Sequence, residues 1–174
     1  MSKEMRKEII SWIIVVVGAV FFSFVLTRCV IVHANVPTGS MMDTVPEKSR
    51  VVGNRLAYLF GEPERFDVVA FLYPDDESQI FLKRIIGLPG ETLEIVDGKV
   101  YINNSDEPLD DSFIREQSHD NWGPFIIPDG CYFMMGDNRT NSHDSRFWQH
   151  TFVDRDKILG KVFFSYYPKV KWIR

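Results

Sequence analysis

A serine set between a glycine and a pair of methionines is the first residue whose surroundings could support chemistry. It lies in the segment Val-Pro-Thr-Gly-Ser-Met-Met, residues 36–42. Pro37 fixes one φ angle and Gly39 permits a sharp bend, so Ser40 is expected on a tight turn. A hydroxyl held there, with backbone N–H groups exposed beside it, suits a nucleophile and its oxyanion site. A polar turn without a catalytic role fits the same residues, so this interpretation needs a base.

The candidates for that base are His143, Asp144 and a lysine. The first two lie in Gly-Asp-Asn-Arg-Thr-Asn-Ser-His-Asp-Ser-Arg, residues 136–146, a polar segment between two hydrophobic runs. The succession His143, Asp144, Ser145 has the composition of a catalytic triad. Consecutive residues of an extended chain, however, point to alternate faces. These residues therefore act with groups elsewhere in the chain, or else they form a solvated loop.

Lys83 is the lysine in question, because it stands inside the apolar run Phe-Leu-Lys-Arg-Ile-Ile, residues 81–86. In a strand, Phe81, Lys83 and Ile85 share one face, which places the amine among apolar groups. Desolvation disfavours the ammonium form and lowers its pKa. A shift from about 10.4 to about 7 corresponds to roughly 4.6 kcal/mol, which full burial can supply. The alternative is that Lys83 extends its amine to solvent.

Other catalytic chemistries lack their motifs in this sequence. None of the four histidines lies four residues from another, and neither cysteine has a neighbouring ligand, so no zinc spacing is present. The sequence contains no GxGxxG, no Walker A loop and no G-x-S-x-G elbow. We therefore expect neither a metal nor a cofactor.

The elements that must hold these residues begin with one long apolar run. A helix over the uncharged residues 9–27 is about 29 Å long at about 1.5 Å per residue, close to a hydrocarbon core of about 30 Å. A mean hydropathy of −0.12 over 174 residues excludes a polytopic membrane protein but not one span. We expect a short cytoplasmic tail at 1–8, a transmembrane helix at 9–32 and a catalytic domain at 33–174. A buried core helix, or a signal sequence cleaved after Val-His-Ala at 32–34, are the alternatives.

The charges around this run predict its orientation. Three basic residues lie in the first eight, whereas Arg28 alone lies directly after the run. This asymmetry favours a cytoplasmic N-terminus and an extracytoplasmic domain at the cell membrane. The total charge is −4, the first eight residues carry +1 and Arg28 adds one more, so residues 36–174 carry −6. An acidic domain of this kind is not expected to bind nucleic acid, and we expect a monomer in contact with lipid.

The remainder of the chain is predicted to be mainly β. Runs rich in β-branched and aromatic residues alternate with Gly, Pro and Asp turns, at residues 50–55, 67–73, 79–86, 92–96, 99–102, 131–135 and 161–167. Asp97-Gly98, between two of these runs, is a strong hairpin signal. The predicted fold class is a transmembrane helix followed by an antiparallel β-sheet domain, with a small polar insertion at about 97–128. Cys29 and Cys131 are interpreted as unrelated thiols, and a bond between them is the alternative.

Three segments taken together resemble the ordered motifs of bacterial type I signal peptidases, in the short form of Gram-positive members. They are Pro-Thr-Gly-Ser-Met at 37–41, Lys-Arg-Ile-Ile-Gly-Leu-Pro-Gly-Glu at 83–91 and the segment 136–146, with a weaker motif at 50–55. One span ahead of them completes the pattern, so the resemblance covers nearly the whole chain. It implies a membrane-bound serine endopeptidase with a Ser–Lys dyad and no metal. Its substrates would be exported preproteins, cut after small residues of the Ala-x-Ala type.

The resemblance also implies a role for individual residues. Ser40 matches the nucleophile that forms an acyl-enzyme, and Lys83 matches the general base. Thr38 matches the hydroxyl that joins the backbone N–H of Ser40 in the oxyanion hole, and Ser142 the hydroxyl that orients the lysine amine. The remaining matches are a structural ion pair and three walls of the substrate pockets, namely Asp144 with Arg146, and Met41, Phe81 and Met134. Asp43 departs from the family pattern, in which proline is commoner, and this bears on the geometry of the turn.

Two other classes of protein stay open at this point. A single-pass β domain could bind an extracellular partner without catalysis if the surroundings of Lys83 were ordinary core. Self-cleaving repressors related to stress-response regulators share Ser–Lys chemistry, but they need a DNA-binding module where this chain has an apolar span. Catalysis with His143 as the base is a separate alternative, which a pH–rate profile distinguishes from lysine.

Overall fold

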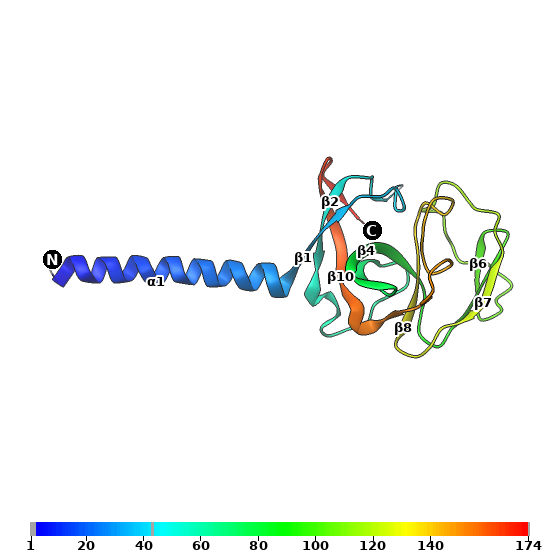
Figure 1. Ribbon diagram of the computed structural model, residues 1–174, viewed down its shortest axis with the longest axis horizontal. Coiled ribbons are helices and arrows are strands. Elements are labelled where there is room, and N and C mark those ends of the chain that lie inside the picture. The colour runs from blue at the N-terminus through cyan, green and yellow to red at the C-terminus, as the bar shows by residue number, and fades with distance from the viewer. Residues whose placement is uncertain (1–2, 43, 174) are drawn as a thin grey trace.

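The computed structural model describes residues 3–42 and 44–173, so Asp43 lies outside the described residues. One straight helix, α1 (Lys3–Val25), leaves the rest of the molecule and continues into a π-helical turn, η1 (Leu26–Val30) (Figure 1). None of its residues is buried, and it is the only helix in the described part of the chain that is long and apolar enough to cross a membrane. Together, α1 and η1 cover residues 3–30, whereas a helix was expected at 9–32. The polar first turns are good helix formers, with Glu4 and Lys7 paired at 3.6 Å.

The chain after the helix forms an antiparallel sheet that contains most of the predicted strands. Its strand order is β1-β2-β10-β3-β4-β8-β9, and β11 pairs with β10. The strand bounds are β1 (Ile31–Val36), β2 (Ser49–Asn54), β3 (Val68–Tyr73), β4 (Asp76–Gly87), β8 (Cys131–Met135), β9 (Val153–Asp154), β10 (Ile158–Tyr167) and β11 (Lys171–Trp172). Two short 3₁₀ turns, η2 (Arg55–Tyr58) and η3 (Arg155–Lys157), connect them.

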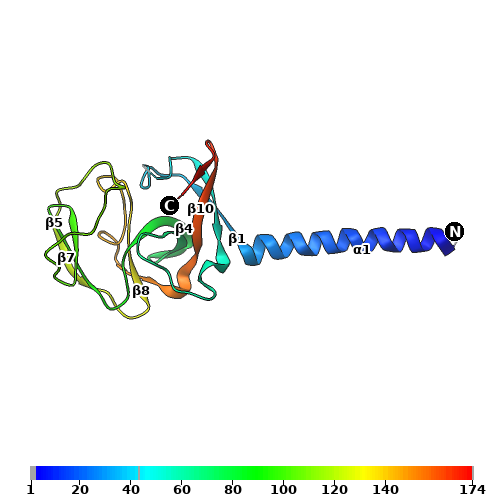
Figure 2. The same ribbon diagram turned by 180° about the vertical axis from the view of Figure 1, so that it is seen from behind.

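A second sheet of three strands lies at the end of the domain farthest from α1 (Figures 1 and 2). Its order is β6-β5-β7, with β5 (Thr92–Val96), β6 (Lys99–Ile102) and β7 (Trp122–Ile126). Asp97 and Gly98 have φ angles of 50° and 77°, which is the mirror-image turn that the Asp-Gly pair predicts. The insertion expected at about 97–128 contains regular structure, of which the run at 99–102 was predicted and β7 was not. It includes β6 and β7, and between these two strands it lies over the segment 136–146.

Three clusters of buried side chains form the core. The first joins β1, β2 and the turn after β1, the second lies between β3, β4 and β8, and the third lies under the small sheet. Representative members are Val32, Met41 and Val51 for the first, Phe71, Ile85 and Met134 for the second, and Leu93, Ile127 and Phe133 for the third. Because β4 borders all of them, the side chains of its second half, residues 82–87, are buried on both faces.

Two minor expectations are also decided by the fold. Cys29 and Cys131 are both free thiols, and the Cys131 thiol donates a hydrogen bond to Asp154 at 3.2 Å.

The sequence Val-His-Ala at 32–34 lies inside β1, and all six residues of that strand are in register with β2. Cleavage after Ala34 would require this edge strand to separate from the sheet, so the structure does not present that bond as an accessible site.

Candidate active site

The turn that carries Ser40 is fixed by short backbone hydrogen bonds. The N–H of Met42 donates to the carbonyl of Gly39 at 3.1 Å, and the N–H groups of Thr44 and Val45 donate to the carbonyl of Met41 at 2.9 and 2.6 Å. Two further bonds come from Asn138, whose N–H donates to the Ser40 carbonyl at 3.0 Å and whose amide donates to the Gly39 carbonyl at 3.1 Å. Segment 136–146 thus holds the serine turn directly.

Lys83 reaches Ser40 from the middle of β4. The strand register places Lys83 opposite Val69 of β3, and the side chain is only 4% exposed. Its Nζ lies 2.6 Å from the Ser40 Oγ, within hydrogen-bond distance, and 5.8 Å from the centroid of the Phe81 ring. Burial lowers the pKa of the Lys83 amine from 10.5 to about 8. The charges of Asp144 and Asp137 raise it in part, and that of Arg146 lowers it further.

The other hydroxyl groups of the predicted site lie near this pair. The Thr38 Oγ1 is 3.3 Å from the Ser40 Oγ, and the Thr38 side chain faces solvent at the turn. Ser142 is buried, but its hydroxyl has no hydrogen-bond partner among the residues that the structure describes. The bond from Ser142 to the Lys83 amine, which the resemblance implied, is therefore not formed here. Ser142 packs instead beside Gly136, which in turn lies against the backbone of Ser40.

Two buried ion pairs stand behind the site. Asp144 and Arg146 form one, in which the guanidinium donates at 2.8 and 3.0 Å and the Gly136 N–H donates to the same carboxylate at 3.0 Å. The other joins Arg84 to Asp137, again through two guanidinium bonds, of 2.8 and 2.7 Å. Sequence reasoning missed this second pair. The sequence feature that could have predicted it is Arg84, a charged residue in an apolar strand that faces the side opposite to Lys83.

His143 does not contact the serine–lysine pair. Its Nε2 lies 3.3 Å from the Tyr73 hydroxyl, and its ring packs against Phe147 and Trp148. His143 does line the same cleft as Ser40, but the nitrogen that bonds the Ser40 hydroxyl belongs to Lys83. The geometry therefore favours the lysine over the histidine as the base.

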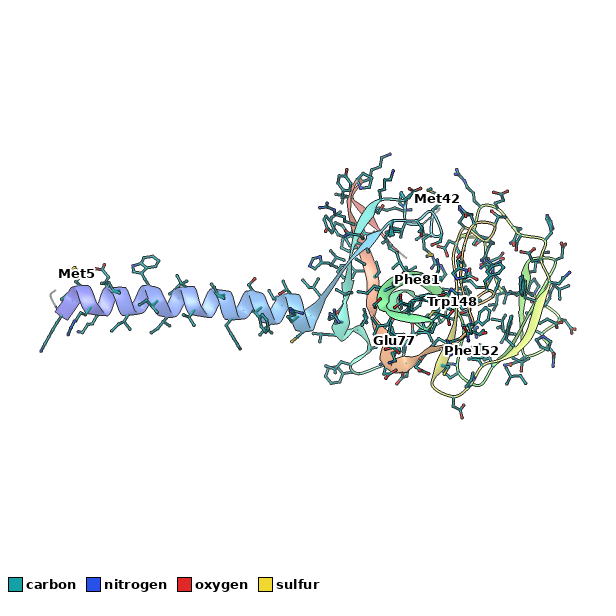
Figure 3. The ribbon with its side chains drawn as sticks, viewed as in Figure 1. Met5, Met42, Glu77, Phe81, Trp148 and Phe152 are labelled. Carbon is teal, nitrogen blue, oxygen red and sulfur yellow. The ribbon has the colours of Figure 1, made fainter. Side chains whose placement is uncertain are left out.

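A cleft of about 300 Å³ opens beside Ser40. The end of β1 and residues 37–38 form one wall, and residues 79–83 of β4 form the other, so two strand edges face each other across it. Phe81 lines the cleft and lies close to Trp148 in the middle of the domain (Figure 3). Met41 and Met134, which were expected in the pocket walls, are fully buried in the core and lie outside the lining.

Gly136 is expected to tolerate no side chain. A Cβ built there would lie 2.5 Å from the Ser40 carbonyl oxygen and would also collide with the Ser142 hydroxyl. Because the first of these atoms is backbone, Gly136→Ala displaces the serine turn, and kcat/KM is expected to fall by on the order of 10²-fold. Steady-state kinetics with the preprotein substrate that the resemblance implies measure this loss. Gly61→Ala is the control, since no atom lies within 4 Å of a Cβ at that position. An unchanged rate in Gly136→Ala would contradict the stated packing.

A serine hydroxyl bonded to a buried lysine amine, on an antiparallel β domain behind one apolar helix, defines a membrane-anchored serine endopeptidase. Comparison with known families agrees, because the model described as "Signal peptidase, peptidase S26" matches residues 9–167. The chain belongs to this family, among the type I signal peptidases of the short Gram-positive form. The family confirms the predicted activity, cleavage of signal peptides from secreted preproteins by a serine endopeptidase. The predicted fold class is confirmed by the apolar helix and the antiparallel sheet described above.

Individual relatives show the extent of the similarity. Signal peptidase I S of Bacillus subtilis (strain 168) is 36% identical over 174 residues, covering 94% of this chain and 91% of that protein. Signal peptidase IB of Staphylococcus aureus (strain COL) is 32% identical over 180 residues, covering 94% and 92%. A crystal structure of a signal peptidase I from Enterococcus faecalis V583 is 33% identical, has a TM-score of 0.47, and covers 57% of this chain and 96% of that one.

Proposed function

We propose that this protein cleaves signal peptides from preproteins at the extracytoplasmic face of the cell membrane, with Ser40 as nucleophile and Lys83 as general base. The observation that carries the assignment is the 2.6 Å separation between a buried amine and the Ser40 hydroxyl. A pKa of about 8 leaves a substantial fraction of the Lys83 amine neutral at physiological pH. A neutral amine can accept the hydroxyl proton, whereas a lysine with the ordinary pKa is almost entirely protonated at this pH and cannot.

In the proposed reaction, Lys83 accepts the proton of Ser40 while the Oγ forms a bond to the scissile carbonyl carbon. The negative charge that develops on the carbonyl oxygen is stabilised by the backbone N–H of Ser40 and by the Thr38 hydroxyl. The Lys83 ammonium then gives its proton to the departing amine, the peptide C–N bond breaks, and an ester to Ser40 remains. Finally, the neutral Lys83 amine takes a proton from water while the water oxygen bonds to the ester carbon. The Lys83 ammonium then returns that proton to the Ser40 Oγ as the ester C–O bond breaks.

The lining of the cleft supports an extended substrate with apolar side chains. An extended substrate can pair with the strand edges on either side of the cleft. The side chains one and three residues before the bond that is cut, at positions −1 and −3, then lie on the same face. Ile80 and Leu82 on β4 and Val36 on β1 give the lining an apolar character. This apolar lining suits apolar side chains at these two positions, and the preference for small residues such as alanine is the one that the resemblance to signal peptidases implies.

The apolar surface near the anchor supports a site close to the lipid. The 3₁₀ turn η2 contacts η1 at the end of the anchor, and the Arg55 guanidinium donates to the Ile31 carbonyl at 3.2 Å. Leu59 and Phe60, directly after η2, are 62% and 96% exposed. Apolar side chains exposed beside a membrane helix are suited to the interface. With the N-terminus in the cytoplasm, as the basic residues favour, the catalytic domain lies on the other side.

The substrate preference is tested with matched preproteins. The purified full-length protein in detergent is expected to cleave a preprotein with alanine at −3 and −1, and leucine at −1 is expected to slow cleavage by on the order of 10²-fold. Leucine at −2 is the control, because that side chain points to the opposite face of an extended substrate. Mass spectrometry of the released N-terminus identifies the bond that is cut. Failure to cut any of these substrates would instead favour a partner-binding domain without catalysis.

A further inference from the structure

Three buried arginines lie in or next to segment 136–146, which holds the serine turn. They are Arg84 on β4, directly after Lys83, and Arg139 and Arg146 in the segment itself, and none is more than 4% exposed. Among the residues that the structure describes on these elements, the carboxylates of Asp137 and Asp144 pair with Arg84 and Arg146, and neither pairs with Arg139. Three guanidinium groups against two carboxylates leave one positive charge in excess, and an uncompensated buried charge is strongly destabilising.

The missing counter-charge comes from the insertion between β6 and β7. The carboxylate of Asp111 lies 3.8 Å from Arg139, and both side chains are largely buried, at 19% and 1% exposed. Asp120, which is half-exposed, lies 3.9 Å from Arg146. In the described part of the chain, no hydrogen bond reaches the Nε and Nη1 of Arg139 or the Nη1 of Arg146. The two insertion carboxylates therefore act on these nitrogens by charge. Solvent screens the pair of Asp111 with Arg139 little, and it screens the half-exposed Asp120 more.

The insertion also covers the third arginine. The ring of Phe113 lies 4.4 Å from the guanidinium carbon of Arg84, within the range of a cation–π interaction. On its other side the same ring packs edge-on against Phe66 at 5.5 Å between centroids. The carbonyl of Phe66 accepts a hydrogen bond from Arg84 at 2.7 Å. Arg84 is thus enclosed, and Phe113 excludes water from its pair with Asp137.

Bonds within the insertion fix these groups in place. The Gln117 amide donates to the Asp111 carboxylate at 2.7 Å, and the Ile114 N–H donates to the Asp111 carbonyl at 2.9 Å. The Gly98 N–H, in the turn between β5 and β6, donates to the carbonyl of Asp120 at 2.9 Å. Asp111 is therefore held by bonds within the insertion, and Asp120 by a bond to the β5–β6 turn of the small sheet.

We propose that the insertion is part of the catalytic apparatus, in which Asp111, Phe113 and Asp120 are positioning residues that hold the three arginines behind Ser40 and Lys83. This inference rests on the proposed function. Arg84 follows Lys83 in β4, and Arg139 follows Asn138, which binds the Gly39 and Ser40 carbonyls. Movement of Arg84 is transmitted through one peptide unit to Lys83. Movement of Arg139 is transmitted to Asn138, and from there through two hydrogen bonds to the turn that carries Ser40.

The test uses Asp111→Asn and Phe113→Ala in the full-length protein, with preprotein cleavage as the assay. Both variants are expected to lower kcat by on the order of tenfold with little change in KM, because the serine–lysine geometry loosens while the cleft is untouched. Asp111→Asn is also expected to move the half-maximal pH of kcat/KM downward. The charges that act directly on the Lys83 amine are those of Asp144, Arg146 and Asp137. Asp111→Asn leaves Arg139, in the same segment as Asp144 and Arg146, without its buried counter-charge, which disfavours a further positive charge at Lys83.

Three further variants make the test decisive. Asp106→Asn removes the same charge from an exposed position of the insertion and is expected to behave as the wild type. Asp111→Glu and Phe113→Tyr keep the charge and the ring, and should recover most of kcat and the original pH. If Asp111→Asn and Phe113→Ala match Asp106→Asn, or if Asp111→Asn loses activity without a pH change and Asp111→Glu does not recover it, the inference is wrong. If the wild-type protein cleaves no preprotein, the proposed function fails instead.

Discussion

Replacing Ser40 by alanine is expected to reduce preprotein cleavage by on the order of 10⁶-fold, which is in practice a complete loss. The Lys83 amine then has no hydroxyl to deprotonate, because it bonds Ser40 and the nearby Thr38 hydroxyl approaches only the Ser40 Oγ. The two bonds from Asn138 go to backbone carbonyls, so they persist in the variant and the turn keeps its shape. Single-turnover cleavage with excess protein, followed on gels and by mass spectrometry, measures the residual rate.

A second buried serine provides the control for Ser40. Ser165 on β10 is as well buried and bonds only backbone carbonyls, those of Arg50 and Tyr167. Ser165→Ala is expected to retain the wild-type rate, although it loses a little stability from its hydrogen bonds. If Ser40→Ala cleaved within tenfold of the wild type while its circular dichroism was unchanged, the nucleophile would have to lie elsewhere.

Most strands of the domain could be predicted because local signals mark both their pattern and their ends. The hairpin of β5 and β6 is the clearest case, since alternating residues flank an Asp-Gly turn whose φ angles are both positive. The predicted runs at 67–73 and 79–86 correspond to β3 and β4 with shifts of one to three residues. The predicted burial of Lys83 follows from the same alternation, because Phe81 and Ile85 share its face.

The strands that were not predicted depend on distant partners. β1 follows the apolar anchor directly, so its first residues continue the hydrophobic run and carry no signal of their own. Its extended form comes from pairing with β2 across a turn that the sequence does not mark as a hairpin. β7 contains Gly123-Pro124, a pair that typically ends a strand, yet it pairs with β5 on its other residues.

The site shows the same limit. The serine and the lysine could be proposed from local sequence, but the bond between them joins residues that are 43 positions apart. Arg84 and Asp137 are 53 positions apart, and neither residue identifies the other in the sequence. Met41 and Met134 were assigned to the cleft by resemblance, whereas the packing of the first two core clusters buries both. Long-range pairing decides such details, and one sequence does not record it.

Replacing Lys83 by methionine is expected to separate the catalytic role of the amine from its effect on stability. Cleavage falls by at least about 10⁴-fold, because no general base remains in contact with Ser40. The wild-type kcat/KM is expected to rise with pH through about 8, as the Lys83 amine loses its proton, and the residual rate of Lys83→Met does not follow that curve. A pH–rate profile of both proteins on one preprotein measures this difference.

Stability should change in the opposite direction from activity. The pKa of the Lys83 amine is about 8 in the folded protein and 10.5 unfolded, so burial of the ammonium costs about 3 kcal/mol below pH 8. Methionine avoids that cost but loses a hydrogen bond of about 1 kcal/mol, so at pH 7 the variant is expected to be more stable by roughly 2 kcal/mol. Between pH 8 and pH 10.5 the unfolded wild-type chain holds a proton that the folded chain lacks. Wild-type stability therefore rises, and the advantage of the variant shrinks.

Urea unfolding at pH 7 and pH 9.5 tests the sign of this effect, with Lys161→Met as the matched control. Lys161 is 44% exposed on β10 and pairs with Asp67, so its loss is expected to leave cleavage unchanged and to give no gain in stability at either pH. A Lys83→Met protein that is less stable than the wild type at pH 7 would mean that the amine is neither desolvated nor strained in its charged form. In that case the lowered pKa could not be the source of its basicity, and the reaction would need a different proton acceptor.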